Sequence, residues 1–280
     1  MEPAEAVRVN RTFHDHECAY YDERFAIVHD ARAARQARAE VERLLGRRLQ
    51  PGEVVLDPGC GTGWHAAGLR RAAPEATVLG ADLSAGMLGR ARAAGAWPLL
   101  QADASALPLA DGSIDLVVTR GVLHHLPDVA GALAEWRRVL RPGGAVVVVS
   151  EPTPAVDRHG AALVRLLLAL LRRPLPPEED FWEVASMAAN LHVFTPAELG
   201  ARARDAGYGE VSLRTAGLVA TLVLTASYVL HGRRRGLARR IPWRAVEAAG
   251  RRIDALACDR VLPSRWRHTV AGVFLVTRRD

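Results

Sequence analysis

Short apolar runs alternate with helical patterns along much of the chain, and no other feature restricts the possible folds as strongly. The runs are rich in β-branched residues and free of polar interruptions, which is typical of parallel strands buried on both faces. Helical periodicity fills the stretches between them. The predicted strands are residues 54–56, 77–79, 97–101, 116–118 and 145–149, and the predicted helices are 31–45, 64–73, 85–94 and 129–140. This order predicts a doubly wound, Rossmann-like α/β sheet.

The alternation breaks after the fifth strand and returns later in the chain. Helices are expected at 155–172 and 178–190, separated by a proline-rich stretch. Thr195 and Glu198 form a capping-box pattern, which predicts the start of another helix. The remaining predicted elements are a strand at 211–224, helices at 226–240 and 243–257, and a strand at 269–277.

A glycine-rich turn follows the first strand. Asp57-Pro58-Gly59-Cys60-Gly61-Thr62-Gly63 lies at a carboxyl strand end, where ligands bind in folds of this class. The glycines allow a sharp turn and a close approach to a ligand, and the Asp57 anion suits a cationic ligand. The G-x-G-x-G spacing differs from the G-x-G-x-x-G of dinucleotide folds, and the absence of lysine excludes a P-loop.

Asp82 ends the second strand, where a carboxylate can accept hydrogen bonds from both hydroxyls of a ribose. Taken alone, an aspartate such as Asp82 is more often a surface or helix-capping residue, but its position after the glycine-rich turn favours the ribose interpretation.

These residues resemble the class I S-adenosylmethionine-dependent methyltransferases of the small-molecule type. Residues 57–63 match the first motif of that family and residues 81–88 match the second. The segments 101–115, 123–128 and 138–144 match later motifs in order. Pro58 departs from the family, which more often has another apolar residue there. The resemblance implies a seven-stranded, mostly parallel sheet with an antiparallel last strand and helical lid insertions. It also implies S-adenosylmethionine as cofactor and S-adenosylhomocysteine as product.

The resemblance also assigns individual residues to the cofactor. Asp57 would orient its amino-acid end, Asp82 would hold the ribose, and Asp103 would hold the adenine amino group. Leu83 and Met87 would pack against the adenine. The other residues expected to contact the cofactor are Gly59, Cys60, Gly61, Gly63, Ala104, Arg120 and Gly121. In addition, Tyr20 and Tyr21 are expected to close over it from the N-terminal segment. For Arg120, a surface ion pair is the alternative.

Two histidines follow the fourth strand at the carboxyl rim. Since a sulfonium is already an excellent methyl donor, the protein chiefly aligns the acceptor and excludes water. If the acceptor is a hydroxyl, His124 or His125 can take its proton, because imidazole titrates near neutral pH. Packing of either ring in the core is the alternative.

Three segments are expected on the cofactor side of the sheet, because the connections after the fifth and sixth strands leave from the carboxyl edge and the N-terminus can fold over the same rim. We expect an N-terminal lid in residues 1–30, a cofactor-binding core in 31–150, a helical lid insertion in 151–194, a core continuation in 195–225, a second helical insertion in 226–266 and a last core strand in 267–280. An apolar acceptor pocket for a natural product or lipid-like molecule would be lined by Phe181, Trp182, Met187, Leu191, His192 and Phe194. Core packing under the lid is the alternative.

Composition limits the possible partners. All 37 basic residues are arginines, and the formal net charge is +6, concentrated in residues 231–280. Codon bias explains arginine in an alanine-rich chain, so nucleic acid is not the expected partner. The cysteines are far apart, which argues against a disulfide framework or zinc site and fits a reducing cytoplasm. No signal peptide or membrane span is expected, and a homodimer is left open. His14-Asp15-His16-Glu17 is rich in ligands, but consecutive residues do not converge on one ion, so no metal is expected.

Other functions stay open at this point. A bound cofactor cation can assist a non-methylating cyclisation or rearrangement in the same fold. A nucleic-acid methyltransferase usually shows an Asn/Asp-Pro-Pro-aromatic turn where Thr119-Arg120-Gly121-Val122 stands here. The glycine spacing disfavours a dehydrogenase, and the intact motifs disfavour a non-catalytic binding module. The favoured function is methyl transfer to a small hydroxylated or carbon-nucleophile acceptor.

Overall fold

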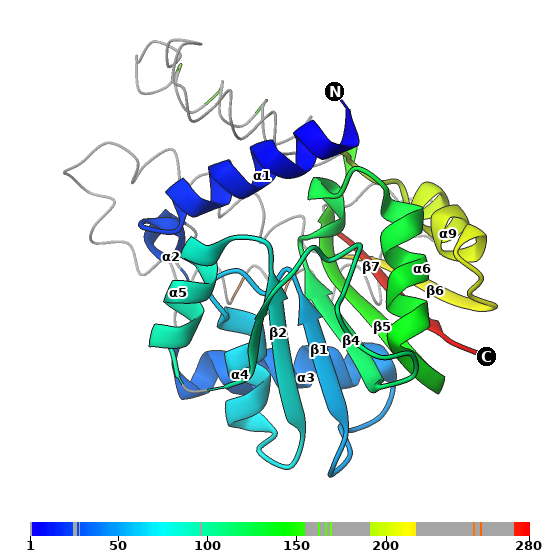
Figure 1. Ribbon diagram of the computed structural model, residues 1–280. Helices are drawn as coiled ribbons and strands as arrows, with labels where there is room; N and C mark the ends of the chain where they lie inside the picture. Colours follow the sequence, from blue (N-terminus) through cyan, green and yellow to red (C-terminus); the bar gives the residue numbers. More distant parts are fainter. Residues whose placement is uncertain are drawn as a thin grey trace.

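A seven-stranded sheet forms the centre of the protein (Figure 1). The computed structural model describes residues 2–24, 27, 29–95, 97–154, 191–216 and 272–280, together with five single positions between 162 and 253. The strand order is β3-β2-β1-β4-β5-β7-β6, and β7 runs antiparallel to both of its neighbours. The strands are β1 (Val54–Pro58), β2 (Thr77–Asp82), β3 (Leu99–Gln101), β4 (Ile114–Arg120), β5 (Leu140–Pro152), β6 (Glu210–Ala216) and β7 (Gly272–Arg278). The predicted fold class is therefore confirmed.

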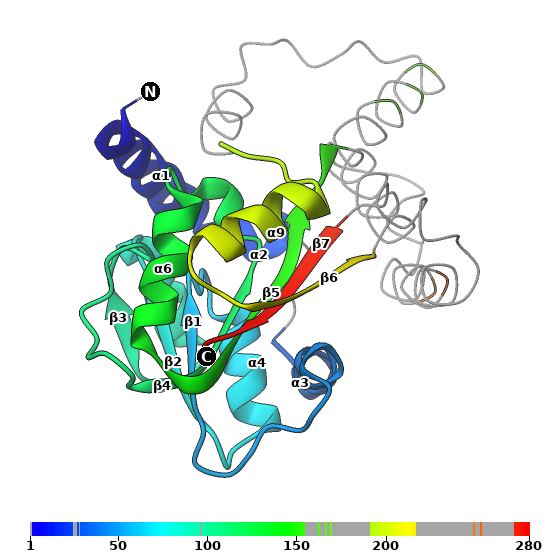
Figure 2. The same cartoon turned by 90° about the vertical axis from the view of Figure 1, so that its right-hand side faces the viewer.

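Helices cover both faces of this sheet. Figure 2 shows α3 (Ala31–Leu45) and α4 (Trp64–Ala72) on one side and α6 (Val129–Val139) and α9 (Pro196–Asp205) on the other. Side chains alternate between the two cores along each central strand. Val55 packs with the α3 and α4 side, whereas Leu56 packs with the α6 and α9 side. Because both faces are buried, the central parts of these strands, such as 54–56 and 116–118, are apolar at every position, which explains the uninterrupted runs in the sequence.

The helix boundaries follow local capping chemistry. The Asp30 side chain accepts a hydrogen bond from the Ala33 N–H and starts α3, which ends at Gly46 with a φ of +71°. The predicted capping box is present at the start of α9, where Thr195 and Glu198 bond reciprocally. Ser84 caps α5 (Ala85–Ala93) by accepting the Met87 N–H on its hydroxyl.

The N-terminal segment crosses the carboxyl edge of the sheet. It forms α1 (Pro3–Glu17) and the short α2 (Tyr21–Arg24), and Figure 1 shows α1 lying above the ends of the central strands. The position at the rim was expected from the sequence, but the helix was not. The helices predicted within 155–190 and 226–257 lie outside the described residues. Among the helices that are described, none has the length and apolar character needed to cross a bilayer.

Candidate functional site

The glycine-rich turn after β1 depends on backbone conformations that favour glycine. Gly59, Gly61 and Gly63 have φ values of +77°, +55° and +80°. A Cβ atom at Gly59 would lie 2.6 Å from a methyl carbon of Val122, and one at Gly63 would lie 2.7 Å from the Trp97 ring. The N–H groups of Gly59 and Cys60 both donate to the carbonyl of Ala81. The turn is thereby fixed against the end of β2.

Asp82 lies where β2 ends and faces the turn. Its Oδ2 atom accepts the Gly61 N–H at 2.8 Å, and its Oδ1 atom accepts the Ser84 N–H at 2.9 Å. Burial raises the pKa of Asp82, while these two backbone hydrogen bonds lower it. Each oxygen keeps a further lone pair, so the oriented carboxylate can accept two more hydrogen bonds, as a ribose diol requires.

Asp57 is buried directly before the turn. Its side chain is 1% exposed, and Oδ2 has no hydrogen-bond partner. Burial, followed by the charge of Asp82, raises the pKa of Asp57 well above its ordinary value. A buried carboxylate oxygen without a partner is unfavourable, and a nearby cation would stabilise its charged form. The orphaned oxygen therefore fits a cofactor that carries positive charge, as the resemblance predicts.

A cavity of about 760 Å³, counting its open mouth, lies between the strand ends and α1. The cavity brings together residues from the ends of β2 and β4, from the loops that follow β1, β2, β3 and β4, and from α1. The predicted residues that line it are Gly59, Gly61, Asp82, Leu83, Met87, Asp103, Ala104, Arg120, Gly121 and His125.

Other predicted residues lie elsewhere. Tyr20 is half exposed and its hydroxyl contacts His16 at 3.1 Å, whereas the adjacent Tyr21 lines the cavity. Asp57, Cys60, Gly63 and His124 are not among the lining residues.

The predicted acceptor-pocket residues divide into two groups. Leu191 and His192 donate their N–H groups to the His124 carbonyl, and Phe194 is 1% exposed in the core cluster that also contains Trp136. The predicted residues Phe181, Trp182 and Met187 lie outside the described part of the chain.

Arg120 ends β4 and combines both roles considered from the sequence. It lines the cavity, and it also forms an ion pair with Glu40 of α3. Its guanidinium lies over the Trp64 ring, 5.1 Å from the centroid, and its Nε atom is buried without a partner. The ion pair and the ring hold the cation at the edge of the cavity.

A buried glutamate holds the first histidine of the predicted pair. Glu151, at the end of β5, is fully buried and accepts the backbone N–H groups of residues 122, 123 and 124 at 2.8, 3.0 and 3.2 Å. Its Oε2 atom also lies 2.8 Å from Nδ1 of His124. Because the carboxylate oxygens already accept three backbone N–H groups, we infer from this geometry that Nδ1 of His124 is a fourth donor to the carboxylate. Nε2 of His124 is therefore the proton-accepting nitrogen.

The chain bends sharply to bring Glu151 to this place. Ser150 has a φ of +62°, which is uncommon outside glycine, and the β5–β7 register shifts between Val148 and Glu151. The sequence analysis missed Glu151. The available signal was a charged residue two positions after the apolar run 145–149, where the strand reaches the carboxyl rim.

Helix α1 supplies one wall of the cavity. Val7, Asn10, Arg11 and His14 line it, and their spacing places them on one face of a helix. Asn10 donates from Nδ2 to the His125 carbonyl at 2.9 Å, and the His14 and His125 rings meet edge to face at 4.9 Å. Asp15 accepts hydrogen bonds from the Ser84 hydroxyl at 2.6 Å and the Gly86 N–H at 3.0 Å. The four lining residues of α1 were not predicted as cavity residues, although the i, i+3, i+4, i+7 spacing of positions 7, 10, 11 and 14 is visible in the sequence.

A family model described as "Methyltransferase domain" matches residues 56–148. The demethylmenaquinone methyltransferase of Corynebacterium kroppenstedtii is 32% identical over 179 residues, which cover 61% of this chain and 75% of the relative. The malonyl-[acyl-carrier protein] O-methyltransferase of Serratia marcescens is 38% identical over 141 residues, which cover 50% of this chain and 54% of that protein. For four of the curated relatives, the matched region spans only 30% to 54% of their length.

Solved structures share the fold. Phosphoethanolamine N-methyltransferase 2 of Haemonchus contortus, in complex with phosphomonomethylethanolamine and S-adenosylhomocysteine, superposes with a TM-score of 0.53. The two proteins are 20% identical, and the match covers 88% of this chain and 52% of the other. At this identity the comparison supports the architecture alone.

Proposed function

Because this chain belongs to the class I S-adenosylmethionine-dependent methyltransferases, we propose that it methylates a small organic acceptor whose reacting atom must lose a proton. The acceptor is a hydroxyl or an acidic carbon. The observation that carries this proposal is the pairing of His124 with the buried Glu151 at 2.8 Å. An acceptor that is already ionised, such as a carboxylate, would need no such pair.

The cofactor contributes a methyl group activated by a positively charged sulfur. The residues proposed to hold it follow the cavity. Asp82 accepts the ribose hydroxyls through the free lone pairs of its two oxygens, and Leu83, Met87 and Asp103 contact the adenine. Asp57 balances the ammonium charge, and Arg120 binds the carboxylate at the amino-acid end.

His124 is the proposed proton acceptor. Glu151 keeps the proton on Nδ1, so Nε2 presents a lone pair. A Cβ atom built on Gly121 would lie 3.7 Å from Cε1 of His124, which places the ring edge beside a cavity-lining residue. His125 packs against His124 with a centroid distance of 3.9 Å and forms the adjoining wall. The proton taken from the acceptor therefore moves to an imidazole that is already aligned.

We also propose that residues 1–30 close over the core, as the sequence indicates. Most of the segments 151–194 and 226–266, expected from the sequence to be lid insertions, lies outside the described residues. The contacts of Asn10 with His125 and of Asp15 with Ser84 support this role for the N-terminal segment. Asp15→Ala should loosen α1 and weaken S-adenosylhomocysteine binding several-fold. Glu5→Ala is the matched control and should leave binding unchanged, because Glu5 lies exposed on the same helix and its ion pair is with Arg8 of α1 itself.

The test of the function is a screen for S-adenosylhomocysteine release from S-adenosylmethionine with phenols, hydroxyquinols, enolisable ketones and carboxylic acids as acceptors. The expected result is turnover with a hydroxyl or carbon acid that falls about 100-fold in His124→Ala. Full turnover by His124→Ala, or activity confined to carboxylic acids, would contradict the proposal.

A further inference from the structure

The loop between β3 and β4 (residues 102–113) carries three cavity residues but forms little secondary structure of its own. Ala102, Asp103 and Ala104 line the cavity from this loop. Asp103 is itself oriented, because Oδ1 accepts both the N–H of Ser105 at 2.8 Å and its hydroxyl at 2.6 Å. The rest of the loop needs partners for its backbone groups, since buried backbone N–H and C=O groups are seldom left unpaired.

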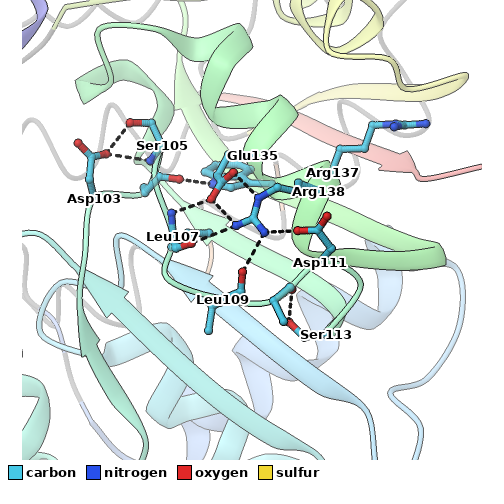
Figure 3. A network of polar contacts seen from close by, with 12 residues as sticks. Asp103, Ser105, Leu107, Leu109, Asp111, Ser113, Glu135, Arg137 and Arg138 are labelled. Atoms are coloured by element: carbon cyan, nitrogen blue, oxygen red, sulfur yellow. Dashed lines mark hydrogen bonds and ion pairs between the residues drawn. The ribbon is translucent and has the colours of Figure 1, made fainter.

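Side chains from α6 provide those partners (Figure 3). Trp136 donates from Nε1 to the Ala104 carbonyl at 2.8 Å. Glu135 accepts the Leu107 N–H at 2.7 Å, and Arg138 donates to the carbonyl of Leu107 at 3.0 Å. Arg138 also bonds the carbonyl of Leu109, at 2.9 Å. The loop is thus held to the helix along its length.

Arg138 is the centre of this network. Its Nε and one terminal nitrogen bind the two carboxylate oxygens of Glu135 at 2.8 and 2.7 Å, and the other terminal nitrogen binds Asp111. Together with the bonds to the carbonyls of Leu107 and Leu109, these contacts use all three nitrogens of the planar guanidinium. A lysine has three donors around a single point and cannot reproduce this fork. The arrangement requires arginine and not simply a positive charge.

We infer that Arg138 and Glu135 are positioning residues that hold the β3–β4 loop in register with the cavity and so set the affinity for the nucleobase part of the cofactor. The inference rests on the proposed contact of Asp103 with adenine. Neither residue lines the cavity, so their effect is exerted through the loop. Small displacements of a preorganised binding group are enough to weaken binding.

The experiment compares two ligands that differ in the base. S-adenosylhomocysteine contains adenine, and S-ribosylhomocysteine lacks it but keeps the ribose and amino-acid portions. Binding of both is measured by calorimetry, directly or by competition. The variants are Arg138→Met, Arg138→Lys and Glu135→Gln. Arg141→Met is the matched control, because Arg141 forms an ion pair with Asp115 at the amino end of β5, at 2.6 Å.

The expected result is about tenfold weaker binding of S-adenosylhomocysteine by both Arg138 variants, with S-ribosylhomocysteine affinity unchanged. Arg141→Met should bind both ligands as the wild type does. Equal weakening of both ligands, or wild-type affinity in a folded Arg138 variant, would overturn the inference. Glu135→Gln serves the same comparison if Arg138→Met does not fold.

The same data separate this inference from the function on which it depends. Wild-type protein that binds both ligands equally would show that adenine does not lie at the loop. That result would contradict both the proposed contact of Asp103 with adenine and the positioning role of Arg138. Wild-type protein that prefers S-adenosylhomocysteine, with Arg138 variants that keep the preference, would overturn only the positioning role.

Discussion

Nδ1 of His124 lies 2.8 Å from Oε2 of Glu151, and the carboxylate is completely buried. The same carboxylate accepts three backbone N–H groups from residues 122–124. One side chain therefore fixes both the loop after β4 and the proton on the ring. The arrangement resembles other enzymes in which a carboxylate orients a histidine that acts as a base.

Glu151→Gln should reduce kcat about 100-fold, because the amide no longer stabilises the imidazolium or fixes its tautomer. Stability should fall by roughly 1–3 kcal/mol, since an amide NH₂ would face backbone N–H donors. S-adenosylhomocysteine affinity should stay within about twofold, since the loop is only one wall of the cavity.

The double variant Glu151→Gln/His124→Ala tests whether the two residues act together. Its kcat should equal that of His124→Ala alone, because the effects of coupled groups are not additive. Nitrogen NMR of the wild-type imidazole should show a protonated Nδ1. Additive losses, or a proton on Nε2, would rule out the proposed pairing.

Asp82→Asn should weaken S-adenosylhomocysteine binding about 10- to 100-fold, which is the usual range for hydrogen bonds to a charged group. The amide cannot accept both the Gly61 and Ser84 N–H groups and two hydroxyls. Calorimetry measures the change, and Asp115→Asn, at the far end of the sheet, is the control. A wild-type dissociation constant for Asp82→Asn would remove Asp82 from the cofactor site.

Gly59→Ala should abolish measurable cofactor binding and lower stability by about 2 kcal/mol or more. A positive φ disfavours alanine, and the new methyl group would meet Val122 at 2.6 Å. The control is Gly89→Ala on α5, where nothing lies within 4 Å of the position that the added methyl group would take and stability should rise by up to about 1 kcal/mol. Thermal melting measures the stability of the two variants, and calorimetry measures their cofactor binding. Equal behaviour of both variants would contradict the steric argument.

His65 should make the protein sensitive to acid. Burial, assisted by the charge of Arg120, lowers its pKa from 6.5 to about 3. Below pH 6.5 the unfolded chain binds a proton at this position that the folded chain does not. His65 therefore does not lower the free energy of unfolding above pH 6.5. As the pH falls from 6.5 towards 3, the free energy of unfolding decreases by at most about 1.4 kcal/mol per pH unit.

Urea unfolding of the wild type and His65→Leu between pH 7 and 4.5 measures this effect. The variant should lose less stability over that range, because both ring nitrogens of His65 are buried without partners and leucine needs none. His16→Gln, at an exposed position, should follow the wild type. Parallel pH curves for the wild type and His65→Leu would exclude His65 as the source. The comparison is needed because the raised pKa values of Asp57 and Asp82 act in the opposite direction.

The strands of the sheet could be predicted from the sequence because each is marked by residues that are neighbours in the chain. Apolar runs such as 145–149 and glycines such as Gly59 have one physical explanation each, and the structure contains the strands and the turn that they indicate. Gly59, Gly61 and Asp82 followed from the same pattern, whereas Leu83, Met87 and Asp103 came from the resemblance to the methyltransferases. Tyr21 was expected to close over the cofactor, and it lines the cavity. Asn10 could not be found in this way, because its place depends on how α1 packs against residues more than 60 positions away. Glu151 was not predicted, and Arg138 was placed in the matched segment 138–144 without a role, because each acts on other protein groups and such contacts leave no spacing in the sequence.

The alternation of Val55 and Leu56 between two cores also limits how this chain can change in length. One residue inserted into β1 would turn every later side chain of the strand to the opposite face. Asp57 would rotate with them, and the turn would lose its place against Ala81. Insertions and deletions in β1 should therefore be eliminated by selection, whereas surface connections between the elements are free to lengthen.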